Sequence, residues 1–279
     1  MVSAPVDPLL AALAGGVRVI DLAQPLVNGM PGSPNHPAFQ LALQRRHGDV
    51  VRADGGSAAN EVIVLGGHVG THIDALAHVS QDGLLYGGVD CRDAVAGGRF
   101  AVHGVEMIAP MVCPGVLLDV AAAHGSECLP GGYGVTADDL REAARRGGVR
   151  LSAGGVCLIR TGWARWWSQP ERYLGRESGV PGVTEDGARW LAEHGVRAAG
   201  TDTTAFDRIP PGTGHAVLPA HRILLVENGI HIIEHLLLEE LAQCGAAEFV
   251  FVLAPLKLVG ATGSPVRPLA LLSGAGAGR

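Results

Sequence analysis

Apolar runs typical of strands alternate along the chain with the wider apolar spacing of helices. Continuous or alternating apolar residues predict strands, which fall at residues 17–22, 61–65, 115–120, 156–160, 196–200, 222–226, 249–253 and 266–272. Helices are predicted where a cap residue precedes spaced apolar positions. They are residues 136–146, the segment that begins at Thr184 and stops at Gly195, and residues 236–244.

No linker or internal repeat divides this series of elements. We therefore expect a single α/β domain over residues 1–279, in which a mixed sheet is flanked by helices. The last residues, 273–279, are only serine, glycine, alanine and arginine. We expect this tail to be frayed.

Composition and charge narrow the class of protein. The chain has 279 residues, of which 47% are hydrophobic and 17% charged, and this balance excludes a disordered chain or a coiled coil. The net charge of −6 gives no electrostatic reason to bind nucleic acid. Without a signal-like start or a run of about 18 apolar residues, we expect a cytoplasmic protein that binds no membrane. The five scattered cysteines fit reduced thiols better than a disulfide framework.

Candidate chemistry is concentrated between His68 and His78. Four possible metal ligands lie in this segment, and imidazole together with carboxylate suits zinc, manganese or iron. Gly70 allows the chain to bend so that His68 and His72 converge. His72 and Asp74 project to one side of an extended segment, and a helical turn that begins at Asp74 brings His78 to the same face.

The motif His68-x-Gly70-Thr71-His72-x-Asp74-x-x-x-His78 resembles the signature of the cyclase-family metal hydrolases, which include bacterial kynurenine formamidases and isatin hydrolases. Residues 30–32 and 115–120 also match, and residues 160–163, 200–203 and 260–268 are similar to the longer-chain, isatin hydrolase-like branch. The resemblance covers nearly the whole chain. It implies a cyclase-like fold of the swivelling β/β/α type, with a mixed sheet or barrel-like core.

The resemblance also implies roles for individual residues. His68, His72 and Asp74 would hold a first metal, and His78 would be a second-metal ligand or a proton carrier. His221 and Glu234 match a later histidine and carboxylate of the family. In binuclear formamidases these two complete a second zinc site, in which the aspartate bridges. In the mononuclear manganese branch this second site is not filled. We therefore expect one or two divalent ions per chain, Mn²⁺ or Zn²⁺.

The implied activity is hydrolysis of a small amide, lactam, ester or lactone by metal-activated water, with His78 or Glu234 as the general acid–base group. One alternative is a polyketide-type cyclase or dehydratase, which adds no water. The other is a non-catalytic protein that binds a metal or small ligand. Because family members are commonly oligomeric, we expect a homodimer or a larger homo-oligomer.

A second motif competes with this interpretation. Residues 231–235 read His-Ile-Ile-Glu-His, the H-x-x-E-H pattern of inverzincin proteases, which requires a helix. The β-branched isoleucines favour a strand instead, with a helix starting near Glu234. His231 and His235 are then residues of the pocket wall or surface. His235 also departs from the pattern of the longer-chain branch, which commonly has asparagine at the position after the glutamate.

Two further segments bear on the substrate. The proline-rich loop at residues 29–37 is rigid and typical of loops that wall a site. Trp163, Trp166 and Trp167 follow a predicted strand. They fit an aromatic substrate pocket and packing under a loop equally well.

Overall fold

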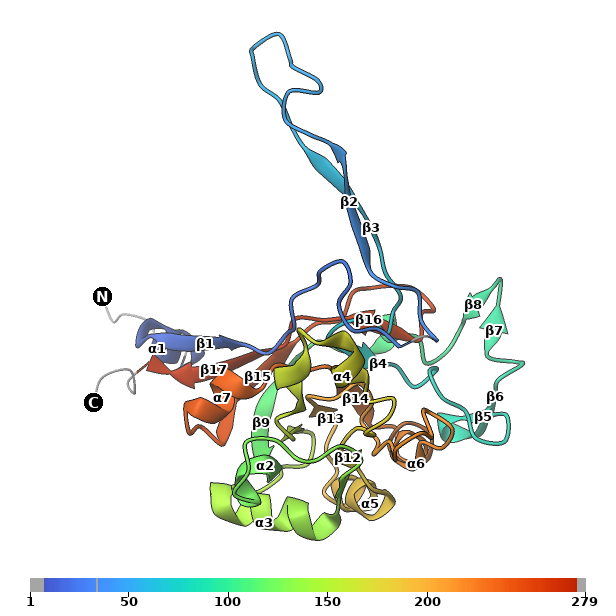
Figure 1. Ribbon diagram of the computed structural model, residues 1–279, viewed down its shortest axis with the longest axis vertical. Coiled ribbons are helices and arrows are strands. Elements are labelled where there is room, and N and C mark those ends of the chain that lie inside the picture. Colours follow the sequence, from blue (N-terminus) through green and yellow to red (C-terminus); the bar gives the residue numbers. More distant parts are fainter. Residues whose placement is uncertain (1–7, 34, 275–279) are drawn as a thin grey trace, which may run out of the picture.

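A nine-stranded mixed sheet forms the centre of the molecule (Figure 1). The computed structural model describes residues 8–33 and 35–274. In spatial order the strands are β1 (Val17–Asp21), β17 (Leu269–Ser273), β15 (Glu248–Leu253), β9 (Met111–Asp119), β11 (Val156–Arg160), β13 (Ala198–Thr201), β14 (His231–Glu234), β4 (His72–Asp74) and β16 (Gly263–Pro265). The pairs from β9 to β14 are parallel and the others antiparallel, so the predicted mixed sheet is confirmed.

Four small two-stranded pairs lie outside this sheet. They are β2 (Gln40–Arg45) with β3 (Asn60–Val64), β5 (Leu84–Leu85) with β6 (Val89–Asp90), β7 (Val95–Ala96) with β8 (Arg99–Phe100), and β10 (Gly134–Val135) with β12 (Gly182–Val183). The β2–β3 hairpin extends far from the body of the molecule as a long arm (Figure 1).

Helices cover the parallel part of the sheet. The α-helices are α1 (Pro8–Ala14), α2 (Val120–Ala123), α3 (Ala137–Gly147), α4 (Pro170–Leu174), α5 (Glu185–Glu193), α6 (Pro219–His221) and α7 (Glu239–Gln243). Three short 3₁₀ turns, η1 (Tyr86–Gly88), η2 (Val105–Met107) and η3 (Trp163–Trp166), and a π-helix, η4 (Arg222–Glu227), complete the set. Thr136 and Asp139 close a full capping box at the start of α3, which explains why this helix begins where the sequence predicts.

Apolar side chains are buried on both faces of the sheet, which accounts for its continuous apolar runs. On one face Leu118 and Ile159 belong to the same core as Leu140 of α3 and Leu191 of α5. The core on the other face includes leucine, isoleucine and phenylalanine side chains of β4, β11, β14 and β15. Every residue of β11 is buried, so the site described below rests on a rigid support.

Some predicted elements differ from the structure. Residues 222–226 form the π-helix η4 and not a strand, because a short buried apolar run cannot by itself distinguish strand from helix. The helix predicted from residue 236, or from Glu234, begins only at Glu239. Ser273 ends β17, so the expected frayed tail does not include it, and residues 275–279 lie outside the described residues.

Among the helices of residues 8–33 and 35–274, none combines the length and apolar composition needed to cross a membrane.

Candidate metal centre

Strand β4 places the first two candidate ligands. His72 and Asp74 are its first and last residues, so their side chains lie on the same face. Nε2 of His72 is 3.5 Å from Oδ1 of Asp74. In the antiparallel pairing with β14, Glu234 lies opposite His72, and its Oε2 is 3.5 Å from the same Nε2. Register therefore brings a carboxylate distant in sequence to the motif.

The turn before β4 depends on Gly70. This residue has a φ of 68°, which favours glycine, and a Cβ here would lie 2.3 Å from a methyl carbon of Leu26. The turn brings the rings of His68 and His72 to a centroid separation of 5.2 Å. The expectation that Gly70 lets the two imidazoles converge agrees with this geometry.

His68 is held on both sides of its ring. Its Nδ1 lies 2.7 Å from Oδ1 of Asp74, and its Nε2 lies 2.9 Å from Oγ1 of Thr262. Gly263 packs against the ring so closely that a Cβ there would lie 2.5 Å from the ring carbon Cε1. The segment after residue 260 thus fixes the orientation of this histidine.

His78 follows β4 on a single turn, in which its backbone N–H donates to the carbonyl of Ala75. Its ring stacks on that of His68 at 3.8 Å. Burial lowers the pKa of His78 to about 4, although nearby Asp74 opposes the change. The ring is therefore neutral at pH 7 and offers a lone pair.

His221 enters the site from the short helix α6. Its Nε2 lies 3.3 Å from Oε1 of Glu234 and 3.8 Å from Oδ2 of Asp74. Its Nδ1 lies 2.6 Å from Oδ2 of Asp207, which also accepts the backbone N–H of His221, while the other carboxylate oxygen accepts that of Ala220. Sequence reasoning missed Asp207, because an isolated aspartate before a proline-rich turn has no recognisable spacing.

Asp74 is the centre of the cluster. It is fully buried, and its Oδ2 is a buried oxygen without a hydrogen-bond partner among the described residues. Burial alone would raise the pKa of Asp74, but the imidazoles of His78, His68 and His72 outweigh it and hold the pKa below its usual value. A buried, ionised carboxylate with a free oxygen fits a bound cation, since such an oxygen is otherwise costly.

The structure brings all six sequence-predicted ligands together in overlapping groups. Ligand atoms of His68, Asp74 and His78 lie within 4.8 Å of one another, as do those of Asp74, His221 and Glu234. The arrangement of imidazole nitrogen and carboxylate oxygen donors fits a borderline divalent ion.

Comparison with known proteins identifies the family of this chain. The model of the Cyclase family matches residues 20–208. The chain belongs to the Cyclase family. A kynurenine formamidase of Sphingopyxis alaskensis is 27% identical over 252 residues, covering 90% of this chain and 97% of that protein. An isatin hydrolase of Roseibium aggregatum is 26% identical over 272 residues, covering 93% and 94%. The crystal structure of a novel cyclase, 28% identical, aligns over 95% of this chain and 93% of its own with a TM-score of 0.82.

The rival protease motif does not form in this Cyclase-family chain. Residues 231–234 are strand β14, as their β-branched side chains predict, so His231 and His235 do not share a helix face. Nδ1 of His231 instead pairs with the backbone carbonyl of Asp74 at 2.9 Å. His235 is buried inside the molecule, which excludes the surface position, and burial lowers its pKa to about 3.

The tryptophans mainly pack beneath the site. Trp163 is buried in a small core with Tyr173, and its indole N–H donates to the carbonyl of that tyrosine. Trp166 lies under the guanidinium of Arg172. Trp167 has its ring 5.6 Å from that of His235, so it supports a residue of the site.

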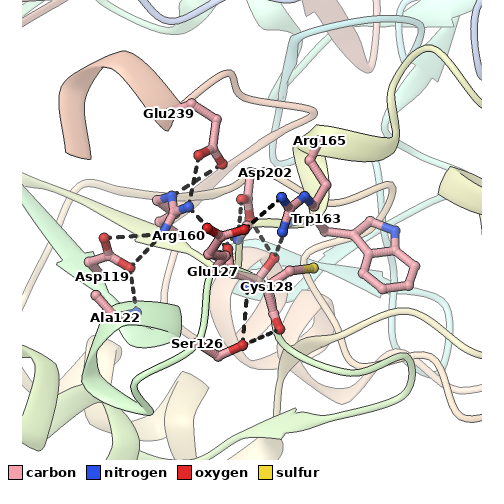
Figure 2. A network of polar contacts seen from close by, with 12 residues as sticks. Asp119, Ala122, Ser126, Glu127, Cys128, Arg160, Trp163, Arg165, Asp202 and Glu239 are labelled. Carbon is pink, nitrogen blue, oxygen red and sulfur yellow. Dashed lines mark hydrogen bonds and ion pairs between the residues drawn. The ribbon is translucent and has the colours of Figure 1, made fainter. Parts of the chain in front are cut away.

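A separate polar network anchors the ends of the central strands (Figure 2). The Arg160 guanidinium donates to Asp119 at 2.9 and 3.1 Å and to Glu239 at 3.1 and 2.7 Å. The backbone N–H groups of the next two residues donate to the carboxylate of Asp202. Burial raises the pKa of Asp202 to about 6, although hydrogen bonds from Thr161 oppose the rise. Hydrogen bonds from residues 160–162 thus connect α7 with the ends of the central strands.

A cavity of about 380 Å³ lies near the candidate centre, although none of the candidate ligands lines it. Its walls include Asn35 and Thr204. Their chain neighbours contact the site: the ring of His36 stacks near His68 at 5.2 Å, and the carbonyl of Thr203 accepts the backbone N–H of His235. A larger cavity of about 660 Å³ lies at the end of strands β9, β15 and β17, and none of the candidate ligands lines it.

Proposed function

We propose that this chain is a metal-dependent hydrolase that cleaves a C–N bond in a small amide or lactam, with an ester or lactone as a related substrate. The observation that carries this is the buried Asp74 carboxylate, whose Oδ2 has no hydrogen-bond partner among the described residues and which is surrounded by imidazoles. The names of the formamidase and isatin hydrolase relatives support the same class of reaction.

His68, His72 and Asp74 would hold the first ion, Mn²⁺ or Zn²⁺. When bound, such an ion lowers the pKa of a water ligand towards neutrality and polarises a carbonyl group. Both ring nitrogens of His68 have hydrogen-bond partners, Asp74 and Thr262, so His68 would give up one of these hydrogen bonds to hold the ion. Glu234 and His221, together with Asp74, would hold a second ion, so the chain would carry one or two ions.

Two residues are candidates for moving protons. His78 is neutral at pH 7 because burial lowers its pKa, and its position beside His68 suits a proton acceptor. Burial alone would raise the pKa of Glu234, but His221 holds it below its usual value, so Glu234 is an ionised base. Such general acid–base assistance typically contributes about 10²–10⁴-fold to a rate.

The substrate would occupy the cavity beside Thr204. The Oγ1 atom of this threonine is buried without a hydrogen-bond partner among the described residues, so it can donate to a polar group of a ligand. A volume of about 380 Å³ matches a small molecule. The proline-rich loop supplies Ser33 and Asn35 to the wall of this cavity.

Product analysis in ¹⁸O-labelled water tests the reaction class. Metal-replete protein is incubated with a panel of aryl formamides, lactams, esters and lactones. We expect a product that carries one solvent oxygen. A cyclised or dehydrated product without the label would favour the cyclase alternative. Absence of turnover across the panel, with metal bound, would favour a non-catalytic binding protein.

We also propose a homodimer or larger homo-oligomer in the cytoplasm. The β2–β3 arm exposes apolar side chains on both of its faces, among them Leu43 (55% exposed) and Ile63 (51%). A two-stranded hairpin is marginal in water by itself, so contact with a second copy would explain its stability. The five cysteines are free thiols, which suits a reducing compartment. Light scattering on the wild type and on a Leu43→Ser, Ile63→Ser variant tests the assembly, which the double substitution should weaken.

A further inference from the structure

The backbone conformation of His235 directs its side chain to the same side as Glu234 and His72, whereas a regular strand would point it to the opposite face of the sheet. His235 directly follows Glu234, the last residue of β14, and successive side chains of a strand point to opposite faces. His235 instead has a φ of 56°. This left-handed conformation breaks the alternation, and ligand atoms of both residues lie within 4.8 Å of each other and of His72.

Two hydrogen bonds hold this unusual conformation in place. The backbone N–H of His235 donates to the carbonyl of Thr203 at 3.0 Å. Its own carbonyl accepts from Oγ1 of Thr71 at 2.7 Å, and Thr71 immediately precedes His72. A left-handed histidine fixed on both sides is the kind of backbone strain that accompanies functional sites.

One ring nitrogen of His235 is already in use. Its Nδ1 lies 3.0 Å from the hydroxyl oxygen of Tyr173, and that hydroxyl also lies 3.3 Å from the carbonyl of Asp202. A carbonyl oxygen can only accept a hydrogen bond, so the tyrosine O–H donates to the backbone carbonyl of Asp202. The tyrosine oxygen then accepts from Nδ1–H, and both hydrogen bonds are satisfied.

This tautomer leaves Nε2 of His235 with a free lone pair. Within the described part of the chain, only Nδ1 of this ring has a hydrogen-bond partner. The ring is fixed between that of Tyr173, stacked at 5.6 Å, and that of Trp167, edge-on at 5.6 Å. Metal-binding histidines are typically held in this way through their other ring nitrogen.

We propose that His235 is a further metal ligand of this centre, binding through Nε2 to the ion that His72 holds, beside Glu234. This rests on the proposed metal-dependent function. Two imidazoles and one carboxylate form a donor set suited to Zn²⁺, Mn²⁺ or Co²⁺. Ligand atoms of His72 and Glu234 also lie close to Asp74, so this set is continuous with the Asp74 groups. His235 lies on the side next to Tyr173.

Cobalt titration of metal-free protein tests the assignment without relying on turnover. Co²⁺ binding to wild type, His235→Asn and Tyr173→Phe is followed by calorimetry and by visible absorption. We expect His235→Asn to weaken binding at least about tenfold and to change the Co²⁺ spectrum, because one nitrogen donor is lost. Tyr173→Phe should weaken binding about 10- to 100-fold, since it removes the group that orients the ring.

The matched control is His194→Asn. His194 caps α5 and its Nδ1 pairs with the carbonyl of Trp190, so this variant should bind Co²⁺ like the wild type. Wild-type affinity and spectrum in His235→Asn would overturn the assignment, as would an effect on substrate KM alone. If His235→Asn does not fold by circular dichroism, Tyr173→Phe decides on the same criteria. A wild type that binds no Co²⁺ would instead refute the proposed metal-dependent function itself.

Discussion

Nδ1 of His221 lies 2.6 Å from Oδ2 of Asp207, a buried carboxylate that also accepts two backbone N–H groups at the start of α6. Asp207 therefore fixes the position of the helix and the orientation of the ring together. Nε2 of His221 is left facing Glu234 and Asp74. A carboxylate behind a ligating histidine typically sets its tautomer and raises its basicity.

Asp207→Asn should weaken metal binding about 10- to 100-fold, because the amide replaces an acceptor with a donor opposite N–H groups. Calorimetric titration of metal-free protein measures this. Asp138→Asn, on the exposed surface of α3, is the control and should bind like the wild type. Equal affinities in all three proteins would mean that other contacts hold His221.

Metal binding should release a proton from His221. Burial alone would lower the pKa of His221, but hydrogen bonds to Asp207 and Glu234 raise it well above the usual value. The metal-free ring is therefore protonated at pH 7, and an ion must displace that proton. Metal affinity should then increase with pH, by up to about tenfold per unit below this pKa.

Calorimetry in buffers of different ionisation enthalpy counts the released protons. On saturation with metal, the wild type should release about one more proton per chain than His221→Ala does, whether or not the variant keeps an ion at the Asp74, His221 and Glu234 group. Equal proton release by the two proteins would contradict a protonated His221 at this group.

Separate substitutions of His221 and Glu234 by alanine report the number of working ions. If a second ion is required, each variant should lose about one ion per chain, because both residues face Asp74 from the same side of the cluster. Elemental analysis of the purified variants measures this. Slower turnover with unchanged metal content would instead indicate a single-ion enzyme.

The chain predicts the local part of the site better than the distant part. His72 and Asp74 share a short strand, so their spacing alone predicts that they face the same way. Glu234 reaches them only through the antiparallel register of β14 with β4, which no local pattern contains; the family resemblance supplied it. Asp207 belongs to neither a motif nor a periodic element, and only the fold brings it to His221.

The same distinction explains the errors in the predicted fold. Strand 156–160 was predictable because a continuous β-rich apolar run is buried on both faces of the sheet. The run at 222–226 has similar composition but continues from α6 and forms η4. It packs against both α5 and α6, and sequence periodicity does not report that packing. The left-handed backbone conformation of His235 could not be predicted either, because histidine usually has a negative φ.

His72→Ala and His78→Ala should differ in kind. His72→Ala removes one of the three primary ligands of the first ion, so metal content and activity should both fall. Asp74→Asn should behave similarly, because it removes the central charge. If His78 only carries protons, His78→Ala should keep its metal and lose about 10²–10⁴-fold in rate. Stoichiometric metal and wild-type turnover in His72→Ala would show that the primary site is assigned wrongly.

Removal and restoration of the metal tests the central claim most directly. The buried cores on both faces of the sheet contain none of the candidate ligands, so the fold should survive without an ion, unlike that of a zinc finger. After dialysis against chelator, we expect amide hydrolysis to disappear while the far-ultraviolet circular dichroism stays unchanged, and added Mn²⁺ or Zn²⁺ to restore the activity. Full hydrolytic activity in protein verified to be metal-free would contradict the account.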